Sequence, residues 1–319
     1  MSVRLPSMLP VPSMVEVCRF LSDPKLDGRH PGGEGHEIAK LYLWDMLGYL
    51  GFQPLFGDSW FQTVMDGPKK VGENVAGFWP GRGGRSLLLA AHYDHFKGIP
   101  GADDNAAALS ILIETCRRLH QWAGDHDLIL CFFDLEEPPY FQTDIMGSAY
   151  FTEYCPINLD TLDCAIVLDL CGHDVSIPGC ENALFVMGAE YSHDLVQAVQ
   201  STESTVISTC MFMNKRIGDM SDHHAFRVAG KPFLFFSCGW WKHYHCVTDT
   251  FDRLNLNKMQ GIAEWLVKLV RNLDGRKVRM NPVHDFGRIE AESLRRLTGG
   301  ELPLVLDGSI AEVMRLMCR

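Results

Sequence analysis

A continuous apolar run at residues 86–92 ends directly in charged side chains, and this junction limits the fold more than any other feature. The interior of the run, Leu-Leu-Leu-Ala-Ala, shows no alternation of polar and apolar residues. Such a pattern is typical of a parallel strand that is buried on both faces. His92 and Asp94 stand at its end. The run therefore presents an imidazole and a carboxylate at the rim of a predicted sheet, where α/β proteins bind their ligands.

Similar runs recur along the chain and alternate with helical patterns. Strand patterns occupy residues 60–64, 74–78, 86–92, 127–133, 162–170, 184–187, 205–211 and 232–237. Helical patterns occupy residues 11–22, 34–50, 106–120, 146–154, 192–201 and 256–273. This alternation predicts an α/β fold, with a mostly parallel mixed central sheet and helices on both faces.

The chain divides at about residue 275. Residues 1–275 are predicted to form a single catalytic domain. Residues 276–319 contain Arg and Glu pairs, a Gly-Gly step and a helical pattern at 310–317, but no chemistry that the sequence identifies. We expect this extension to pack on the domain or on a partner subunit of a homo-oligomer.

Composition narrows the classes of partner and compartment. The net charge of −11 argues against nucleic-acid binding, which needs surplus Lys and Arg. We expect an acidic surface to account for most of this charge and ligand carboxylates for part of it. No apolar run reaches the length of a membrane span. Prolines near the N-terminus interrupt any signal-peptide core, and the 11 scattered cysteines include no CxxC pair. The expected location is the cytoplasm, with free thiols.

Charged side chains also follow other buried runs, and the carboxyl ends of parallel strands share one edge of a sheet. Glu136 and Glu137 follow the run at 127–133, and Asp169 ends the next one. His245 lies in the loop after the last predicted strand. We therefore expect these groups to converge with His92 in one crevice.

The spacing of these groups suits metal binding, although a structural interpretation exists for each pair. His92 and Asp94 point to the same side of an extended backbone, where the carboxylate can accept the far N–H of a ligating imidazole. The alternative is a buried polar pair without a metal. The adjacent Glu136 and Glu137 are harder to explain without a cation, because an unpaired buried carboxylate costs several kcal/mol or becomes protonated. One of the two can bind a metal while the other accepts a proton.

Asp103 and Asp104 stand just before the helical pattern at 106–120. Asp is a favoured capping residue at a helix N-terminus, so helix capping is one interpretation of this pair. The other is a carboxylate that is aimed into the crevice from a tight loop. The sequence pattern leaves both open.

Taken together, these residues resemble the co-catalytic zinc aminopeptidases, the family typified by bacterial leucyl aminopeptidase and related to glutaminyl cyclases. Five blocks of its pattern occur in order between residues 92 and 250: His-x-Asp, Gly-Ala-Asp-Asp-Asn, Glu-Glu, a strand-end Asp and His-x-x-x-Asp-Thr. Residues 26–35 and 50–54 also resemble family motifs. The chain departs from the pattern at 106–108, where Ala-Ala-Ala stands in place of the Ser-Gly that often follows the Asn.

The resemblance implies a ligand set for two zinc ions, with Co²⁺ or Mn²⁺ as substitutes. The five implied metal ligands are His92, Asp103, Glu137, Asp169 and His245. Asp103 is expected to bridge the ions, Glu136 to be the general base and Asp94 to orient His92. Asp104 and Asp249 are expected beside the ligands rather than among them.

Two of these assignments contain a choice. His95 competes with His92, and the period-two spacing beside Asp94 favours His92. His243 competes with His245, and the His-x-x-x-Asp-Thr frame favours His245. Residues 218–224 are further candidates to line the mouth of the site.

The implied activity is hydrolysis of the N-terminal bond of peptides with a free N-terminus, through a metal-activated water and a Glu base. One alternative is a glutaminyl-peptide cyclotransferase with a single zinc. Another is a carboxypeptidase that releases glutamate, for which Arg216 is the nearby basic candidate. A third is a binding protein on a degenerate scaffold. A degenerate scaffold is expected to have lost at least one of the metal-binding side chains, and none of them is missing from this sequence.

Overall fold

The computed structural model describes residues 11–300 and contains one nine-stranded sheet with the order β1-β3-β5-β4-β6-β9-β7-β8, in which β2 pairs with β3. The strands are β1 (Gln53–Pro54), β2 (Phe61–Asp66), β3 (Lys69–Trp79), β4 (Arg85–His92), β5 (His126–Phe133), β6 (Leu162–Leu168), β7 (Ala183–Met187), β8 (Ser208–Met211) and β9 (Phe233–Ser237). The α-helices are α1 (Met14–Leu21), α2 (Glu34–Tyr49), α3 (Ala108–Arg118), α4 (Gly147–Glu153), α5 (His193–Gln200), α6 (Asn214–Ile217), α7 (His223–Val228), α8 (Leu256–Leu273) and α9 (Phe286–Leu297). The helix predicted at 310–317 lies outside the described residues.

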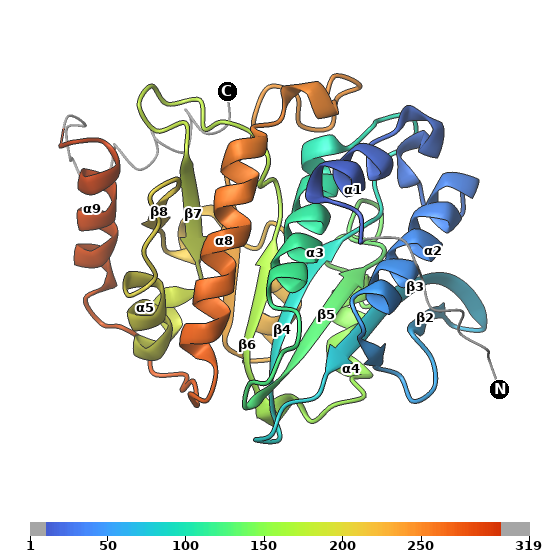
Figure 1. Cartoon of the computed structure of the whole chain (residues 1–319), viewed down its shortest axis with the longest axis horizontal. Coiled ribbons are helices and arrows are strands. Elements are labelled where there is room, and N and C mark those ends of the chain that lie inside the picture. Colours follow the sequence, from blue (N-terminus) through green and yellow to red (C-terminus); the bar gives the residue numbers. More distant parts are fainter. Residues whose placement is uncertain (1–10, 301–319) are drawn as a thin grey trace.

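The predicted α/β architecture is confirmed. Strands β5, β4, β6 and β9 form a parallel centre, and β3 and β7 pair antiparallel with its two edges. Helices α1, α3 and α8 cover one face of the sheet (Figure 1). On the other face, α4 and α7 pack together and contact the sheet through β3, β6 and β9. Helix α9 packs against β8 at the far edge.

The middle of each central strand is apolar because helices cover both faces of the sheet. Leu87, Leu88 and Leu89 of β4 have no exposed surface. The parallel register pairs His92 with Phe133 of β5 and Ala90 with Val167 of β6. The carboxyl ends of these strands therefore reach the same edge of the sheet, and the charged residues that follow them are brought together there.

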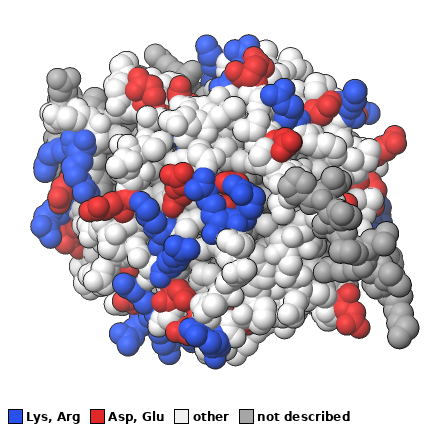
Figure 2. Space-filling view, in the orientation of Figure 1, with Lys and Arg blue, Asp and Glu red and all other residues white. Residues whose placement is uncertain are grey.

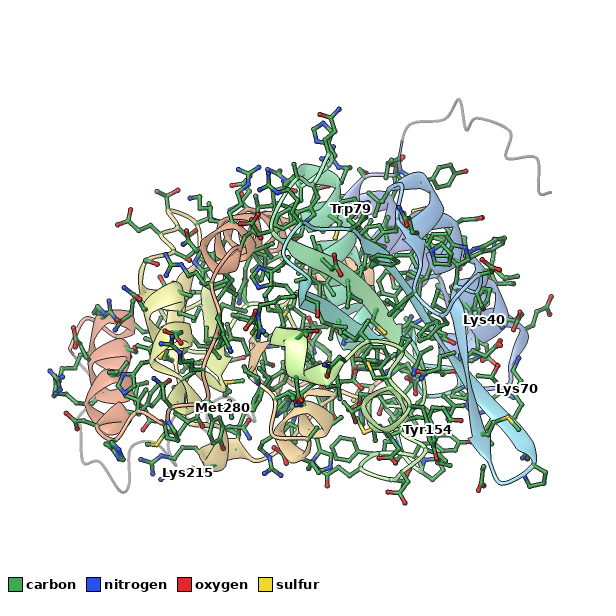
Figure 3. The ribbon with its side chains drawn as sticks, turned by 90° about the horizontal axis from the view of Figure 1, so that it is seen from below. Lys40, Lys70, Trp79, Tyr154, Lys215 and Met280 are labelled. Atoms are coloured by element: carbon green, nitrogen blue, oxygen red, sulfur yellow. The ribbon has the colours of Figure 1, made fainter. Side chains whose placement is uncertain are left out.

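The surplus negative charge lies mainly inside the protein, so the expectation of an acidic surface is wrong. Among the described residues, twelve Asp and Glu side chains are buried but only three Lys and Arg side chains. This difference of nine charges accounts for most of the net charge of −11. On the face shown in Figure 2, acidic and basic side chains are intermingled. Figure 3 shows how one buried cation is compensated: Lys40 lies near the exposed Lys70, and both pair with Glu73.

Between residues 11 and 300, no helix has the length and apolar character that a membrane crossing requires.

Candidate metal centre

The candidate site is built on four loops, which follow the parallel strands β4, β5, β6 and β9. His92 is the last residue of β4, and Asp169 directly follows β6. Each of the two other chain segments makes its turn through a non-glycine residue in the left-handed region, with φ of 58° at Leu135 and 54° at His245. Such conformations are uncommon away from functional sites. They turn the chain so that Glu136, Glu137 and the His245 ring face the end of the sheet.

The described residues contain two groups of metal-ligating side chains, and Asp104 belongs to both. In each group, one donor atom from every member lies within 4.8 Å of the others. The Oδ1 atom of Asp104 lies 3.3 Å from Nε2 of His92, and its Oδ2 atom lies 3.2 Å from Nε2 of His245. Each carboxylate oxygen of Asp104 therefore faces a different imidazole, as a bridging ligand requires.

The first group consists of His92, Asp104 and Asp169. Nε2 of His92 lies 3.6 Å from Oδ2 of Asp169. Its other ring nitrogen, Nδ1, is 3.1 Å from the main-chain oxygen of Asp94. Donation from Nδ1–H to that oxygen fixes the tautomer in which Nε2 carries a free lone pair toward the cluster.

The second group consists of Asp104, Glu137, His95 and His245. Glu137 contacts both imidazoles, with Oε1 at 2.6 Å from Nδ1 of His95 and Oε2 at 3.3 Å from Nε2 of His245. The structure thus places both His92 and His95 at the site, although the sequence treated them as alternatives. His243 lies apart from it, with Nδ1 at 2.8 Å from Oγ1 of Thr248.

Asp103, the residue predicted to bridge the metals, does not reach the cluster. Its Oδ1 atom accepts the backbone N–H of Gly172 at 2.6 Å, and its Oδ2 atom lies 2.7 Å from Nδ1 of His173. The reason is the way in which the turn at Asp103 and Asp104 is held. Asp249 accepts the backbone N–H groups of both Asp103 and Asp104, and the turn held in this way aims successive side chains in different directions. Asp104, which was expected beside the ligands, takes the central place instead.

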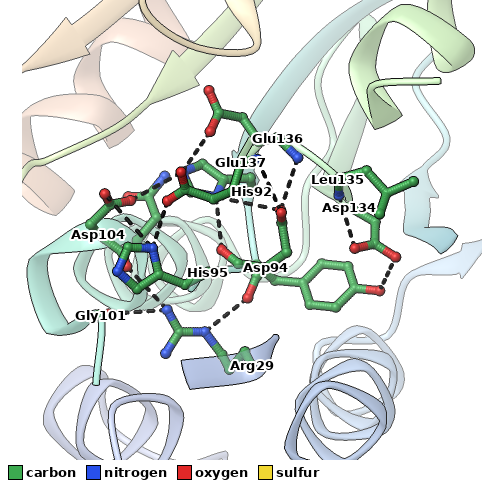
Figure 4. A network of polar contacts seen from close by, with 12 residues as sticks. Arg29, His92, Asp94, His95, Gly101, Asp104, Asp134, Leu135, Glu136 and Glu137 are labelled. Atoms are coloured by element: carbon green, nitrogen blue, oxygen red, sulfur yellow. Dashed lines mark hydrogen bonds and ion pairs between the residues drawn. The ribbon is translucent and has the colours of Figure 1, made fainter. Parts of the chain in front are cut away.

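Asp94 contacts both His92 and the glutamate pair. Its Oδ1 atom lies 3.6 Å from Nδ1 of His92, which also lies 3.1 Å from its main-chain oxygen, so its role in orienting His92 stays a prediction. Its carboxylate also accepts the backbone N–H groups of Glu136 and Glu137 at 3.0 and 3.1 Å. The Asp94 side chain therefore fixes the glutamate pair, as Figure 4 shows. Four of the five predicted ligands, His92, Glu137, Asp169 and His245, do converge, and their metal-binding roles stay predictions.

The donor set fits zinc. The Nε2 atoms of His92 and His245 and the Oδ1 atom of Asp169 are buried and have no hydrogen-bond partner within residues 11–300. Buried polar atoms are nearly always paired, so an unpaired set in one cluster calls for an ion. Imidazole nitrogens with carboxylate oxygens are donors that suit zinc.

Electrostatics favours the same conclusion. Burial raises the pKa of Glu136 well above its ordinary value, and Glu137 and Asp169 raise it further while His92 opposes the shift. Burial lowers the pKa of His245, but the nearby carboxylates of Asp104 and Glu137 outweigh it and raise the pKa to about 10. These carboxylates therefore need positive charge beside them, and a dication supplies it.

Two buried residues near the site carried no metal-ligand signal in the sequence. Asp222 lies in the predicted mouth segment 218–224, yet both of its oxygens are buried without a hydrogen-bond partner in the described structure. Its burial raises its pKa to about 7. Arg29 is also fully buried. It lies within the family-like motif at residues 26–35, but nothing in that motif reveals what its guanidinium contacts.

Arg29 fixes the loop that carries Asp104. Its Nε donates to the carbonyl of Tyr93, and its Nη1 and Nη2 atoms donate to those of Pro100, Gly101 and Asp104. A fifth bond goes to the carbonyl of Leu21, at the end of α1. All five N–H donors of the guanidinium are therefore used on backbone carbonyls, and Figure 4 shows the side chain beneath the cluster.

A cavity of about 160 Å³ opens beside the cluster. One end is formed by Asp104, Glu136, Glu137, Asp169 and His245. The rest of its lining is largely apolar and includes Phe141, Met187, Ile217, Met220, Phe235 and Trp240. The charged cluster thus continues directly into an apolar pocket.

Comparisons with known proteins identify the family and agree with the fold. The sequence profile of Peptidase family M28 matches residues 74–270. The uncharacterized protein YfbL of Escherichia coli is 27% identical over 242 residues, which cover 66% of this chain and 72% of YfbL. A Zn-dependent exopeptidase from Parabacteroides distasonis superposes with a TM-score of 0.62 and 19% identity, over 82% of this chain and 99% of that one. A glutaminyl cyclase from Tannerella forsythia gives a TM-score of 0.63 and 18% identity, over 82% and 99% of the two chains.

Proposed function

The chain belongs to peptidase family M28, and from this premise we propose that it is a zinc-dependent aminopeptidase that holds two metal ions. In this proposal His92, Asp104 and Asp169 hold one ion, and Asp104, Glu137 and His245 hold the other. His95 adjoins the second set through Glu137. Co²⁺ and Mn²⁺ are the expected substitutes.

The observation that carries the proposal is the position of Asp104 between two imidazoles. A single-zinc site needs only one set of donors, whereas Asp104 belongs to two sets here. The arrangement supports two ions and, with them, hydrolysis. Two ions are suited to activating a water molecule on one side and holding the carbonyl oxygen of the scissile bond on the other.

Zinc ions held by these residues would supply Lewis acidity for the scissile carbonyl and for a water molecule. The protein supplies the proton transfers. Glu136 lies at the charged end of the cavity, where its carboxylate accepts a proton from the attacking water and returns it to the leaving amine. Asp94 holds Glu136 in place through the backbone N–H bond described above.

The cavity supports a preference for a free, apolar N-terminal residue. The carboxylates at one end attract a substrate α-ammonium, and the apolar lining receives the side chain of the first residue. A cavity of about 160 Å³ is close in size to the apolar cavity of about 150 Å³ that accepts benzene in an engineered protein. We therefore expect cleavage after leucine, methionine and phenylalanine.

The rival readings fare less well. Arg216, the candidate for binding a substrate carboxylate, instead donates from Nη2 to Oε2 of Glu290 at 3.2 Å and does not line the cavity. We also propose a cytoplasmic location, because all ten described cysteines are unpaired, as is usual in a reducing compartment.

The proposal is tested with zinc-loaded protein and three peptides that differ only at the N-terminus: leucine, N-acetyl-leucine and glutamine. Mass spectrometry is expected to show release of leucine from the first peptide and no cleavage of the second. Ammonia release from the glutamine peptide without chain cleavage identifies a cyclotransferase and refutes the proposal. Cleavage from the carboxyl end identifies a carboxypeptidase and does the same.

A further inference from the structure

The C-terminal helix α9 contains a buried carboxylate in the middle of its apolar face. Phe286, Glu290 and Leu294 are spaced by four residues, so they share one side of the helix. All three are buried, and Glu290 has no exposed surface. A buried carboxylate at such a position costs several kcal/mol unless it is well hydrogen-bonded. Its contacts therefore indicate why this face tolerates it.

Glu290 reaches across to the segment that contains α6. Its Oε1 atom accepts the backbone N–H of Met213 at 3.0 Å, and its Oε2 atom accepts Nη2 of Arg216 at 3.2 Å. Arg216 is followed directly by Ile217, which lines the cavity. Figure 3 shows Lys215 of α6 on the same side of the molecule as α9. One carboxylate thus holds both ends of the turn that places Ile217.

The remaining ties of this segment continue toward the mouth of the cavity. Glu190 accepts the backbone N–H of Asn214. The side-chain amide of Asn214 donates to Asp219 at 2.9 Å, and Asp219 also accepts from Arg227 of α7. Met220, the next residue after Asp219, lines the cavity. A series of polar contacts therefore runs from α9, through α6, to the two apolar residues that line this side of the cavity, Ile217 and Met220.

Building on the proposed function, we propose that Glu290 is a positioning residue for substrate selection. It fixes the wall formed by Ile217 and Met220 against which the first side chain of the peptide packs. The helix that carries it lies beyond residues 74–270, the part that the family profile matches. The preference of this chain for large apolar N-termini thus depends on an element outside the peptidase core.

The test compares Glu290→Ala, Glu290→Gln and, as a matched control, Glu292→Ala, which changes an exposed glutamate on the same helix. Each variant is assayed on two peptides that differ only in an N-terminal leucine or alanine. In Glu290→Ala, the leucine-to-alanine ratio of kcat/KM is expected to fall about tenfold, the scale set by one or two methylene contacts in an apolar pocket. The change is expected in KM for the leucine peptide, with kcat and zinc content unchanged.

The conservative variant separates positioning from mere stability. Glu290→Gln keeps an acceptor oxygen for the N–H of Met213, so its ratio is expected between those of the wild type and Glu290→Ala. Hydrogen exchange of residues 208–220 is expected to quicken in Glu290→Ala and to stay at the wild-type rate in Glu292→Ala. An unchanged ratio in Glu290→Ala overturns the inference, and so does an equal loss on both peptides accompanied by loss of zinc.

A binding measurement keeps this inference distinct from the proposed function. Calorimetry with free L-leucine and L-alanine on the zinc-loaded protein measures how tightly each amino acid binds against Ile217 and Met220, without any catalytic step. If the wild type binds leucine more tightly and Glu290→Ala loses that margin, the inference stands even when no peptide is cleaved. If the margin survives in Glu290→Ala, the inference fails even when the aminopeptidase activity is confirmed.

Discussion

The loop that carries Asp104 and the segment that lines the cavity are both fixed through their backbones, but the first is held by a hydrogen-bond donor and the second by acceptors. The first, residues 93–104, is held by the buried guanidinium of Arg29, which donates to four of its carbonyls. The second, residues 213–217, is held by the carboxylates of Glu190 and Glu290, which accept its backbone N–H groups.

The difference follows from local charge and from which backbone groups need partners. The loop at residues 93–104 is crowded by carboxylates, so a cation that bonds only to backbone carbonyls takes up no carboxylate oxygen and offsets part of the negative charge. The cavity segment begins a short helix, whose first N–H groups have no partner within the helix, and a carboxylate satisfies them. The two regions are therefore expected to fail differently: the first through lost metal, the second through lost selectivity.

The largest expected effect separates Asp104 from its neighbour. Asp104→Ala removes the only side chain shared by both donor groups, so we expect loss of both zinc ions and at least about a 10⁴-fold loss of activity, since both catalytic ions are removed. Asp103→Asn is the matched control, because Asp103 contacts Gly172 and His173 instead. Zinc content measured by atomic emission checks both. Equal zinc loss in the two variants contradicts the assignment of the bridge.

Glu136→Gln is expected to keep both ions and lose activity by about 10²–10⁴-fold, the usual contribution of a general base. The substitution preserves the backbone N–H that Asp94 accepts, so the loop stays in place. Zinc content and kcat are measured on one sample. Wild-type turnover at full zinc occupancy removes Glu136 from the base role.

Arg29→Lys tests the loop at residues 93–104 without changing a proposed metal ligand. Lysine keeps the charge but has three donors in place of five, so two or more buried carbonyls lose their bonds. We expect zinc affinity to fall about 10–100-fold, as for other residues that support metal ligands. Competition with a chelator measures it. Arg216→Lys is the control from the cavity segment, and zinc affinity that falls equally there erases the contrast between the two regions.

Sequence patterns predicted the fold and most of the residues at the site for a clear reason. The buried parallel strands read as uninterrupted apolar runs, and the residues that follow them must meet at one edge of the sheet. His92 and Asp169 were found in this way because they stand at or directly after a strand end, and Glu137 because it lies in the short loop that follows β5.

The sequence led to Asp103 as the bridge in place of Asp104, because the directions of these two side chains depend on the turn held by Asp249, a residue about 145 positions away. It likewise gave no sign of the Arg29 or Glu290 contacts. Both act on backbone groups, which carry no sequence signal, and both join segments far apart in the chain. Motifs therefore predict ligands better than they predict the residues that hold the ligand-bearing loops.

The smallest expected effect concerns Glu190, which holds the segment at residues 213–217. Burial raises its pKa from an ordinary 4.5 to about 7, so between these two pH values it is protonated in the folded protein but ionised in the unfolded chain. The contribution of Glu190 to the stability of the folded state is therefore complete below about pH 4.5 and is lost as the pH rises through about 7.

Glu190→Gln removes the titration, so its stability relative to the wild type is expected to increase between pH 5 and 8, by on the order of 1–3 kcal/mol. Urea unfolding at these two pH values measures the difference, with the exposed Glu292→Gln as control. A constant difference between Glu190→Gln and the wild type contradicts the raised pKa and shows instead that Glu190 is ionised in the folded protein over this pH range.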